Sequence, residues 1–300
     1  MFTGFRTFDI ATDDDVHVHG RIGGSGPPLL LLHGHPQTHA IWHHLAEPLA
    51  RHYTVVTTDL RGYGDSAKPA GEPDHANYSK RVMAADQVAV MRELGFSRFS
   101  LCGHDRGGRV GHRLAMDHPE TLERLMLLDI APTLAMYEQT DRTFATAYFH
   151  WFFLIQPAPL PETLIEASPE DYVTRTMGGR HASLDAFDPA AIAEYQRCLA
   201  QPGAAHALCE DYRAAATIDL EHDRADRDTG RRIACPLRVL WGQHGVIERC
   251  FDPLAEWRHV AERVDGEALP CGHYLPEEAP ETLLAQITDF FPHDQPGDTP

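Results

Sequence analysis

The 300-residue sequence contains no long hydrophobic run. Its strongest apolar runs, Leu29 to Leu32 and Leu125 to Leu128, are far shorter than the roughly 20 residues that a membrane-spanning helix needs. The first residues, Met1 to Arg6, also lack the apolar stretch of a signal peptide. We therefore expect no membrane segment and no targeting signal, and the cytoplasm is the expected location.

Positive charge is scarce in this chain. Its 26 Lys and Arg residues face 44 Asp and Glu residues, which gives a formal net charge of −18. Nucleic acids and anionic membrane surfaces repel such a protein, so neither is expected as a partner. For the same reason, an anionic substrate would need local positive groups that overcome the field of the whole molecule.

Cysteine pairs and metal-binding motifs are also missing. The six cysteines include no Cys-x-x-Cys pair, and we expect them to be reduced and mostly packed thiols. The spacing of the 20 histidines indicates no metal site. We therefore expect neither a metal nor a cofactor.

Short apolar runs alternate with helical patterns along most of the sequence. This alternation predicts an α/β fold, in which helices flank a mostly parallel sheet, here of eight strands. An alternating segment, Val16 to His19, is expected in an N-terminal hairpin. Helical patterns cover Ser79 to Leu94, Gly107 to Met116 and Glu277 to Phe290.

The interval 133–232 breaks the alternation. It is rich first in aromatic residues and proline, and then in alanine-containing helical stretches such as Pro189 to Leu199. We interpret it as a helical cap inserted into an α/β core made of residues 1–132 and 233–293. The polar, proline-containing residues 294–300 are expected to form a flexible C-terminal tail.

A predicted strand, Phe99 to Cys102, runs directly into Gly103-His104-Asp105-Arg106-Gly107, where a helical pattern begins. The same glycine spacing around a serine forms the nucleophile elbow, a tight turn that exposes one side chain above a sheet. No serine is present here, and Asp105 takes its place. On this motif alone, Asp105 could equally be a helix N-cap.

An aspartate nucleophile needs a base only in its second step. With a reference pKa of about 3.9 it is ionised at neutral pH and can attack a saturated carbon directly, forming an ester. A base must then activate water against that ester. His273 is the predicted base, because it follows the last predicted strand and comes last in chain order.

The acid that orients His273 is less obvious. Many proteins with such an elbow carry it in a Trp-Gly-x-x-Asp pattern after the penultimate strand, but Gly245 stands at that place here. We choose Asp129, which ends the preceding core strand, and keep Asp252 as a weaker rival. Asp129 could otherwise be a helix or loop cap.

Two backbone N–H groups, those of His35 and Arg106, are expected to form an oxyanion hole for the ester carbonyl. Arg106 and Arg109 lie three residues apart at the start of the elbow helix, so their side chains share a face. Two guanidinium groups can hold a carboxylate bidentately, and the helix N-terminus adds partial positive charge. Alternatively, the two arginines pair with cap acids or face solvent.

Several longer motifs resemble those of the fluoroacetate dehalogenases, within the haloalkane dehalogenase and epoxide hydrolase branch of the α/β-hydrolases. The resemblance covers nearly the whole chain. It rests on His33-Gly34-His35-Pro36-Gln37, Gly103-His104-Asp105-Arg106-Gly107-Gly108-Arg109, Tyr148-Phe149-His150-Trp151, Gln156-Pro157-Ala158-Pro159-Leu160-Pro161-Glu162 and Cys209-Glu210-Asp211-Tyr212-Arg213-Ala214.

The resemblance implies that Asp105 attacks the α-carbon of a small anionic haloacid, a haloacetate, while Arg106 and Arg109 hold its carboxylate. The halide would leave into a pocket of hydrogen-bond donors. These donors would be His150, Trp151 and Tyr212. The resemblance also implies a homodimer.

In the second step that the resemblance implies, His273, oriented by Asp129, activates water and releases glycolate. The chain departs from the family pattern in two places. Relatives usually have an aromatic residue where His35 stands, and the segment Met177 to His181 lacks an expected bulky aromatic residue. Both departures leave the shape of the pocket open.

Two other functions fit parts of the pattern. An epoxide hydrolase shares the aspartate nucleophile, but a tryptophan commonly follows that nucleophile, whereas Arg106 does so here. A catalytically silent carboxylate-binding protein of the same fold would not need to keep nucleophile, base and acid together. We therefore expect a haloacetate dehalogenase.

Overall fold

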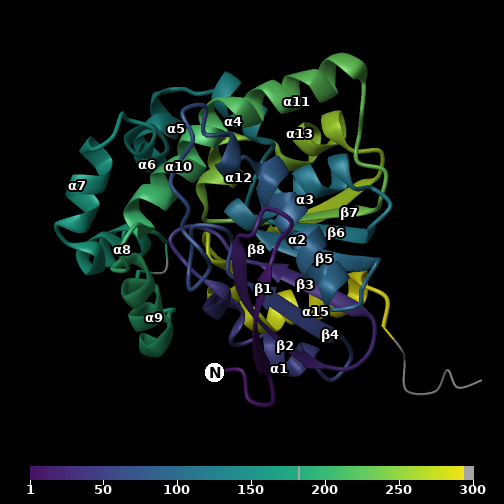
Figure 1. The fold of residues 1–300 in the computed structure, drawn as a ribbon. Helices are drawn as coiled ribbons and strands as arrows, with labels where there is room; N and C mark the ends of the chain where they lie inside the picture. The colour runs from purple at the N-terminus through teal and green to yellow at the C-terminus, as the bar shows by residue number, and fades with distance from the viewer. Residues whose placement is uncertain (182, 294–300) are drawn as a thin grey trace, which may run out of the picture.

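The computed structural model describes residues 1–181 and 183–293. In this part of the chain, one sheet of eight strands runs through the molecule in the order β1-β2-β4-β3-β5-β6-β7-β8 (Figure 1). The predicted tail at 294–300 lies outside the described residues. The strands are β1 (Arg6–Ala11), β2 (His17–Gly24), β3 (Pro28–Leu32), β4 (Thr54–Thr58), β5 (Phe99–His104), β6 (Leu122–Leu128), β7 (Leu237–Gly242) and β8 (Val264–Leu269).

The sheet is mostly parallel, which confirms the predicted α/β architecture. Strands β1 and β2 form an antiparallel N-terminal hairpin, and β2 pairs with β4, also antiparallel. Every other neighbouring pair, from β4 across β3, β5, β6 and β7 to β8, is parallel. Parallel strands bring their carboxyl ends to one edge of the sheet, and this edge carries the candidate site.

The central strands are apolar on both faces, because both faces are covered. In β3, Leu30 and Leu32 pack into one hydrophobic cluster, whereas Leu29 and Leu31 pack into a second cluster across the sheet. Successive side chains of a strand point to opposite faces, so a doubly covered strand reads as a continuous apolar run.

Helices cover the two faces of the sheet. On one face, α2 (Lys80–Glu93) packs against α3 (Arg106–Asp117), which contacts β5 and β6. On the other face lie α1 (Ala46–Leu49) and α15 (Pro280–Phe290). The remaining elements of the core are the 3₁₀ turns η1 (His39–Trp42) and η2 (Ala76–Tyr78) and the helices α12 (Val246–Cys250), α13 (Pro253–Val260) and α14 (Leu275–Glu278).

A run of helices, which we call the helical insert, separates β6 from β7. In Figure 1 it lies along the left side and across the top of the molecule, beside the sheet rather than within it. It consists of α4 (Thr133–Glu138), α5 (Arg142–Ala147), α6 (Phe149–Leu154), α7 (Leu160–Glu166), α8 (Pro169–Gly178), α9 (Pro189–Leu199), α10 (Ala204–Ala216) and α11 (Ile218–Thr229).

One predicted helix is divided in the structure. The pattern from Glu277 to Phe290 was expected to form a single helix, but α14 ends at Glu278 and α15 begins at Pro280. Proline has no N–H to donate to the preceding turn, and its ring clashes there, so the first helix stops. Proline suits the first position of a new helix, which explains where α15 starts.

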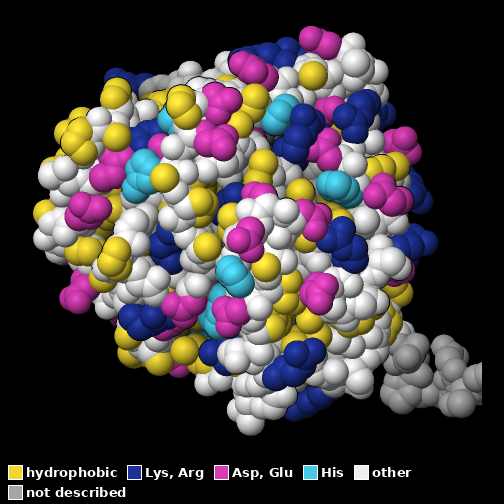
Figure 2. Space-filling model, in the orientation of Figure 1, with side chains coloured by type: hydrophobic (Ala, Val, Ile, Leu, Met, Phe, Trp, Pro, Cys, Tyr) yellow, Lys and Arg dark blue, Asp and Glu magenta, His cyan; other side chains and the backbone are white. Residues whose placement is uncertain are grey.

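The visible surface mixes charges of both signs, as Figure 2 shows. Hydrophobic side chains are most numerous over the helical insert at the left of the view. There, Leu160 and Leu164 of α7 are more than half exposed. Within the described residues, no helix combines the length and the apolar character needed to cross a membrane.

Candidate active site

Asp105 lies in the tight turn between β5 and α3, with a φ of 45° and a ψ of −113°. The flanking glycines are needed because backbone passes close to both. A Cβ on Gly103 would lie 2.6 Å from the Gly107 oxygen, and one on Gly107 would lie 2.5 Å from the His33 oxygen. The turn therefore has the shape of a nucleophile elbow.

The side chain of Asp105 does not cap α3. It makes no capping hydrogen bond, although Asp105 occupies the N-cap position. Its Oδ2 accepts a hydrogen bond of 3.0 Å from the backbone N–H of His35 instead. The Arg106 N–H, the other predicted oxyanion donor, is the first N–H of α3 and has no acceptor within that helix.

Asp105 is buried, yet its surroundings favour the ionised form. Burial opposes the negative charge, but the attraction of His273 in its protonated form, and of Arg109 and Arg106, outweighs burial and holds the pKa of Asp105 well below its ordinary value. The carboxylate is therefore charged at neutral pH. An ionised carboxylate can act as a nucleophile without a base, so this state is compatible with the predicted role.

His273 and Asp129 are in direct contact. The two atoms His273 Nδ1 and Asp129 Oδ2 lie 2.5 Å apart, and Asp129 Oδ1 accepts a hydrogen bond of 2.9 Å from the Gly242 N–H. Burial lowers the pKa of His273 and raises that of Asp129, because each loses solvation of its charged form. His273 is therefore neutral near pH 7, which is the form that accepts a proton.

The two alternatives to Asp129, namely Asp252 and an acid at position 245, lie in different places. Asp252 accepts a hydrogen bond of 2.9 Å from the Ala255 N–H and caps α13. A Cβ on Gly245 would lie 3.3 Å from Asp129 Oδ1. A side chain at position 245 would therefore begin beside the Asp129 carboxylate, close to His273. In this chain, Asp129 is the acid that contacts His273.

Replacing Asp129 by asparagine is expected to lower kcat by about 10²–10⁴-fold, because the neutral amide no longer stabilises the positive charge that His273 acquires. The matched variant Asp252→Asn loses a carboxylate that caps a helix and should keep near-normal kcat. Steady-state halide release under saturating substrate measures both. Equal losses in the two variants would contradict the Asp129 assignment.

Arg106 is held in place by the helical insert. Its Nε and Nη2 donate to the carboxylate of Asp211 in α10 at 2.7 and 2.9 Å, and Nη2 also donates to the Asp211 carbonyl. Arg106 therefore does pair with an acid of the insert, which was the alternative considered for it. The pairing leaves Arg106 Nη1 buried without a hydrogen-bond partner, and the guanidinium carbon lies 4.1 Å from the centre of the Tyr212 ring.

Arg109 lies one turn further along α3. Its Nη1 donates to the Ala131 carbonyl and to Thr133 Oγ1 at 3.1 and 2.9 Å, and its guanidinium lies 4.7 Å from the centre of the Trp151 ring. Its Nε is buried without a partner. Both predicted arginines therefore keep one unused donor inside the protein.

The three predicted halide donors come together in the helical insert. His150 and Trp151 lie on α6, and their ring centres are 5.9 and 6.4 Å from that of Tyr212 on α10. The Tyr212 hydroxyl is buried without a partner. Burial lowers the pKa of His150 well below its usual value, so its imidazole is neutral.

His35 packs against two of the predicted halide donors. Its ring stacks on His150 at 5.6 Å and meets Tyr212 edge-on at 5.4 Å. Burial lowers the pKa of His35 to about 3. A neutral, stacked imidazole thus occupies the place where an aromatic residue was expected, and it keeps an unpartnered Nδ1.

Sequence reasoning missed two charged residues of this region. Asp211, which fixes Arg106, was quoted only as part of a motif next to Tyr212. Arg180 lies in the segment described as lacking an aromatic residue, and its guanidinium lies 4.8 Å from the centre of the Tyr148 ring. Only the tertiary structure reveals these neighbours.

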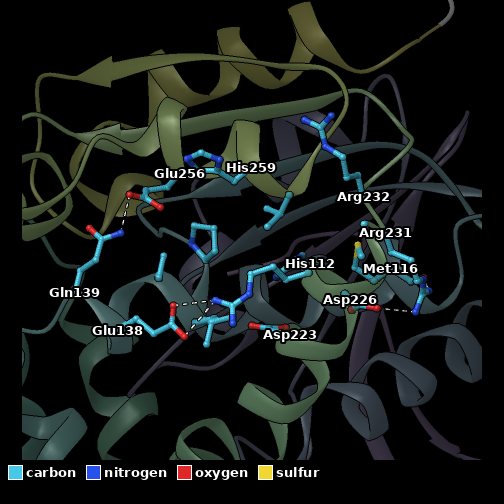
Figure 3. Close-up of a pocket in the computed structure, with 16 residues that line it drawn as sticks. His112, Met116, Glu138, Gln139, Asp223, Asp226, Arg231, Arg232, Glu256 and His259 are labelled. Atoms are coloured by element: carbon cyan, nitrogen blue, oxygen red, sulfur yellow. Dashed lines mark hydrogen bonds and ion pairs between the residues drawn. The ribbon is translucent and has the colours of Figure 1, made fainter.

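A cavity of about 350 Å³ lies between α3, α4, α11 and α13 (Figure 3). Its charged side chains largely satisfy one another, as in the ion pairs Arg227 with Glu138 and Arg231 with Asp226. None of the predicted site residues lines it. We therefore place the candidate active site at Asp105 and not in this cavity.

Comparisons with known proteins show the family to which the chain belongs. The family model for the α/β-hydrolase fold matches residues 27–245. A fluoroacetate dehalogenase of Burkholderia sp is 46% identical to this chain, over 97% of the chain and 95% of the relative. A soluble epoxide hydrolase of Corynebacterium sp. (strain C12) is 33% identical, over 91% of the chain and 93% of the relative.

The fold is also similar to solved structures. A crystal structure of a protein from Nostoc sp PCC 7120, described as an α/β-hydrolase, has a TM-score of 0.94 and 57% identity, covering 97% of this chain and 99% of the other. This chain is thus similar to known proteins, in sequence and in structure, over nearly its whole length. The chain belongs to the α/β-hydrolase family.

Proposed function

We propose that this enzyme hydrolyses haloacetates to glycolate and halide through an ester on Asp105. The observation that carries the proposal is a set of buried donors without partners, gathered around an ionised carboxylate. They are Arg106 Nη1, Arg109 Nε and Tyr212 Oη. An unsatisfied buried donor costs about 1–3 kcal/mol, so such a set indicates an anionic ligand rich in acceptor atoms.

In the first step, a carboxylate oxygen of Asp105 attacks the α-carbon of the haloacetate. The new C–O bond forms as the carbon–halogen bond breaks, and the halide leaves with the bonding electron pair. Arg106 Nη1 and Arg109 Nε are free to hold the substrate carboxylate. Their charges also reduce the repulsion between two anions that must approach each other.

The leaving halide needs stabilisation, because fluoride in particular is a poor leaving group. We infer that the neutral donors of His150, Trp151 and Tyr212, whose rings lie together, receive it. Hydrogen bonds to charge that develops only in the transition state raise kcat.

In the second step, His273 takes a proton from water, and the resulting hydroxide attacks the carbonyl carbon of the ester. The His35 N–H, which lies on Asp105 Oδ2, stabilises the oxyanion together with the Arg106 N–H. Collapse of this intermediate breaks the bond to the glycolate oxygen, which takes the proton from His273, and leaves Asp105 as a carboxylic acid. Because the pKa of Asp105 is held low, the acid then loses its proton to solvent and the carboxylate is restored. We also propose that the helical insert acts as the cap of this site.

Similarity to fluoroacetate dehalogenase supports the substrate class, and similarity to a soluble epoxide hydrolase names the rival. Arg106, next to the nucleophile, favours an anionic substrate. From the same resemblance we infer a cytoplasmic homodimer.

We expect halide release from fluoroacetate or chloroacetate, and no diol formation from styrene oxide. An ion-selective electrode measures the halide, and chromatography measures the diol. Diol formation without any halide release would replace the proposal with epoxide hydrolysis. Tight acetate binding with neither reaction would favour a silent carboxylate-binding protein.

A further inference from the structure

A cavity of about 400 Å³ opens directly over the base of the proposed mechanism. His273 and His150 form part of its wall, so it adjoins the candidate active site. Helices α8 and α12 and the segment between α8 and α9 contribute most of the rest. We call it the vestibule.

The charged side chains that line the vestibule are all positive. Its charged lining residues are Arg175, Arg180 and Arg249, and no Asp or Glu lines it in the described part of the chain. Arg175 pairs with Asp171 outside the cavity at 2.6 Å. Arg180 and Arg249 have no carboxylate within ion-pairing distance among the residues that the structure describes. In a protein with a net charge of −18, this local excess of positive charge is unusual.

Arg180 links the vestibule to the reacting groups. It is half-buried, and its guanidinium lies over the rings of Tyr148 and Tyr274, 4.8 and 6.0 Å from their centres. Its field lowers the pKa of His273, after burial, and reaches Asp105 as well. A half-buried guanidinium without a partner acid favours an anion beside it.

The outer rim is built from two histidines. His181 and His244 stack with ring centres 4.3 Å apart, and both are exposed. A Cβ on Gly272 would lie 2.7 Å from His181 Cβ, so the segment that carries Arg180 rests on the loop that carries His273. The rim is therefore fixed against the catalytic loop.

We propose that the vestibule is an anion-selective entrance, in which Arg249 and Arg180 draw carboxylate substrates inward before Arg106 and Arg109 hold them. The proposal rests on the proposed function only for the identity of the substrate. Clefts lined by one sign of charge raise the encounter rate of oppositely charged ligands, and salt weakens this effect. The vestibule thereby counters the repulsion that the rest of this acidic protein exerts.

The first test compares Arg249→Glu with Arg51→Glu. Arg51 is exposed and lies just before β4, at the amino end of a parallel strand and thus away from the site. We expect Arg249→Glu to lower kcat/KM for chloroacetate about tenfold at low ionic strength, with kcat unchanged. High salt should shrink the difference. Equal behaviour of the two variants would overturn the proposal.

A neutral substrate distinguishes an effect of charge from an effect of pocket shape in Arg249→Glu. Chloroacetamide has nearly the size of chloroacetate but no charge, so its kcat/KM should be the same in Arg249→Glu and the unaltered enzyme at every salt concentration. Loss of chloroacetamide turnover equal to that of chloroacetate would overturn the electrostatic account. Arg180→Gln should lower kcat/KM for chloroacetate more than for the amide, and Arg180→Lys should restore most of it.

Calorimetric titration with acetate measures how tightly the enzyme binds a carboxylate, without any turnover. We expect Arg249→Glu to weaken acetate binding at low salt and Arg51→Glu to leave it unchanged. If the unaltered enzyme released no halide but showed this pattern, the entrance would stand and the proposed function would fall. If the unaltered enzyme released halide and acetate bound equally to both variants, the anion-selective entrance would be contradicted and the proposed function would stand.

Discussion

Replacing Asp105 by alanine is expected to reduce halide release from haloacetates by at least about 10⁴-fold, because no other carboxylate among residues 1–181 and 183–293 is in place to form the ester. Asp129 is committed to His273, and Asp211 is committed to Arg106. Water alone would have to displace the halide. Steady-state halide release with the purified variant measures the effect.

Asp105→Asn is the companion variant, because Asp105 has a positive φ that strains alanine more than asparagine. Its amide oxygen can still accept the hydrogen bond from the His35 N–H, so the elbow should keep its shape. We expect it to fold, to bind acetate and to release no halide. Halide release by a folded Asp105→Asn at a rate near that of the unaltered enzyme would contradict the nucleophile assignment.

Replacing His273 by glutamine is expected to stop the reaction after its first half. Alkylation of Asp105 needs no base, but hydrolysis of the ester does, so each active site should release one halide and then stall. Steady-state turnover should fall by about 10²–10⁴-fold. Rapid-quench measurement of halide shows the burst and its amplitude.

The control for this variant is His206→Gln. His206 lies on α10, the helix that carries Tyr212, but pairs with Glu162 away from the site. It should give normal steady turnover. Loss of the burst itself in His273→Gln would mean that His273 acts before the ester forms, which contradicts its assignment to the second step.

Much of the fold could be predicted because the relevant signals are local. Continuous apolar runs indicate strands covered on both faces, as in Leu29 to Leu32, and the run of glycines around Asp105 indicates a tight turn. Helix α9 begins and ends where the pattern predicted, at Pro189 and Leu199. The pattern from Glu277 to Phe290 misled, because periodicity alone does not register the break at Pro280.

The site was only partly predictable, because strand ends can be read from sequence but contacts of the helical insert cannot. Asp129 and His273 both follow strands that end at one edge of the sheet, so their proximity follows from topology. Arg106 meets Asp211 across 105 positions of sequence. Arg180 reaches Tyr148 from an irregular segment, where no periodic pattern fixes the direction of a side chain.

The central claim is a covalent ester on Asp105, and its most direct test is the mass of the peptide that carries this residue. His273→Gln is mixed with chloroacetate, quenched in acid and digested. The account predicts that the peptide containing Asp105 gains one carboxymethyl group, that Asp105→Asn gains none, and that the gain equals the halide released in the burst. An unmodified Asp105 peptide after a full burst of halide, or the added group on another residue, would contradict it.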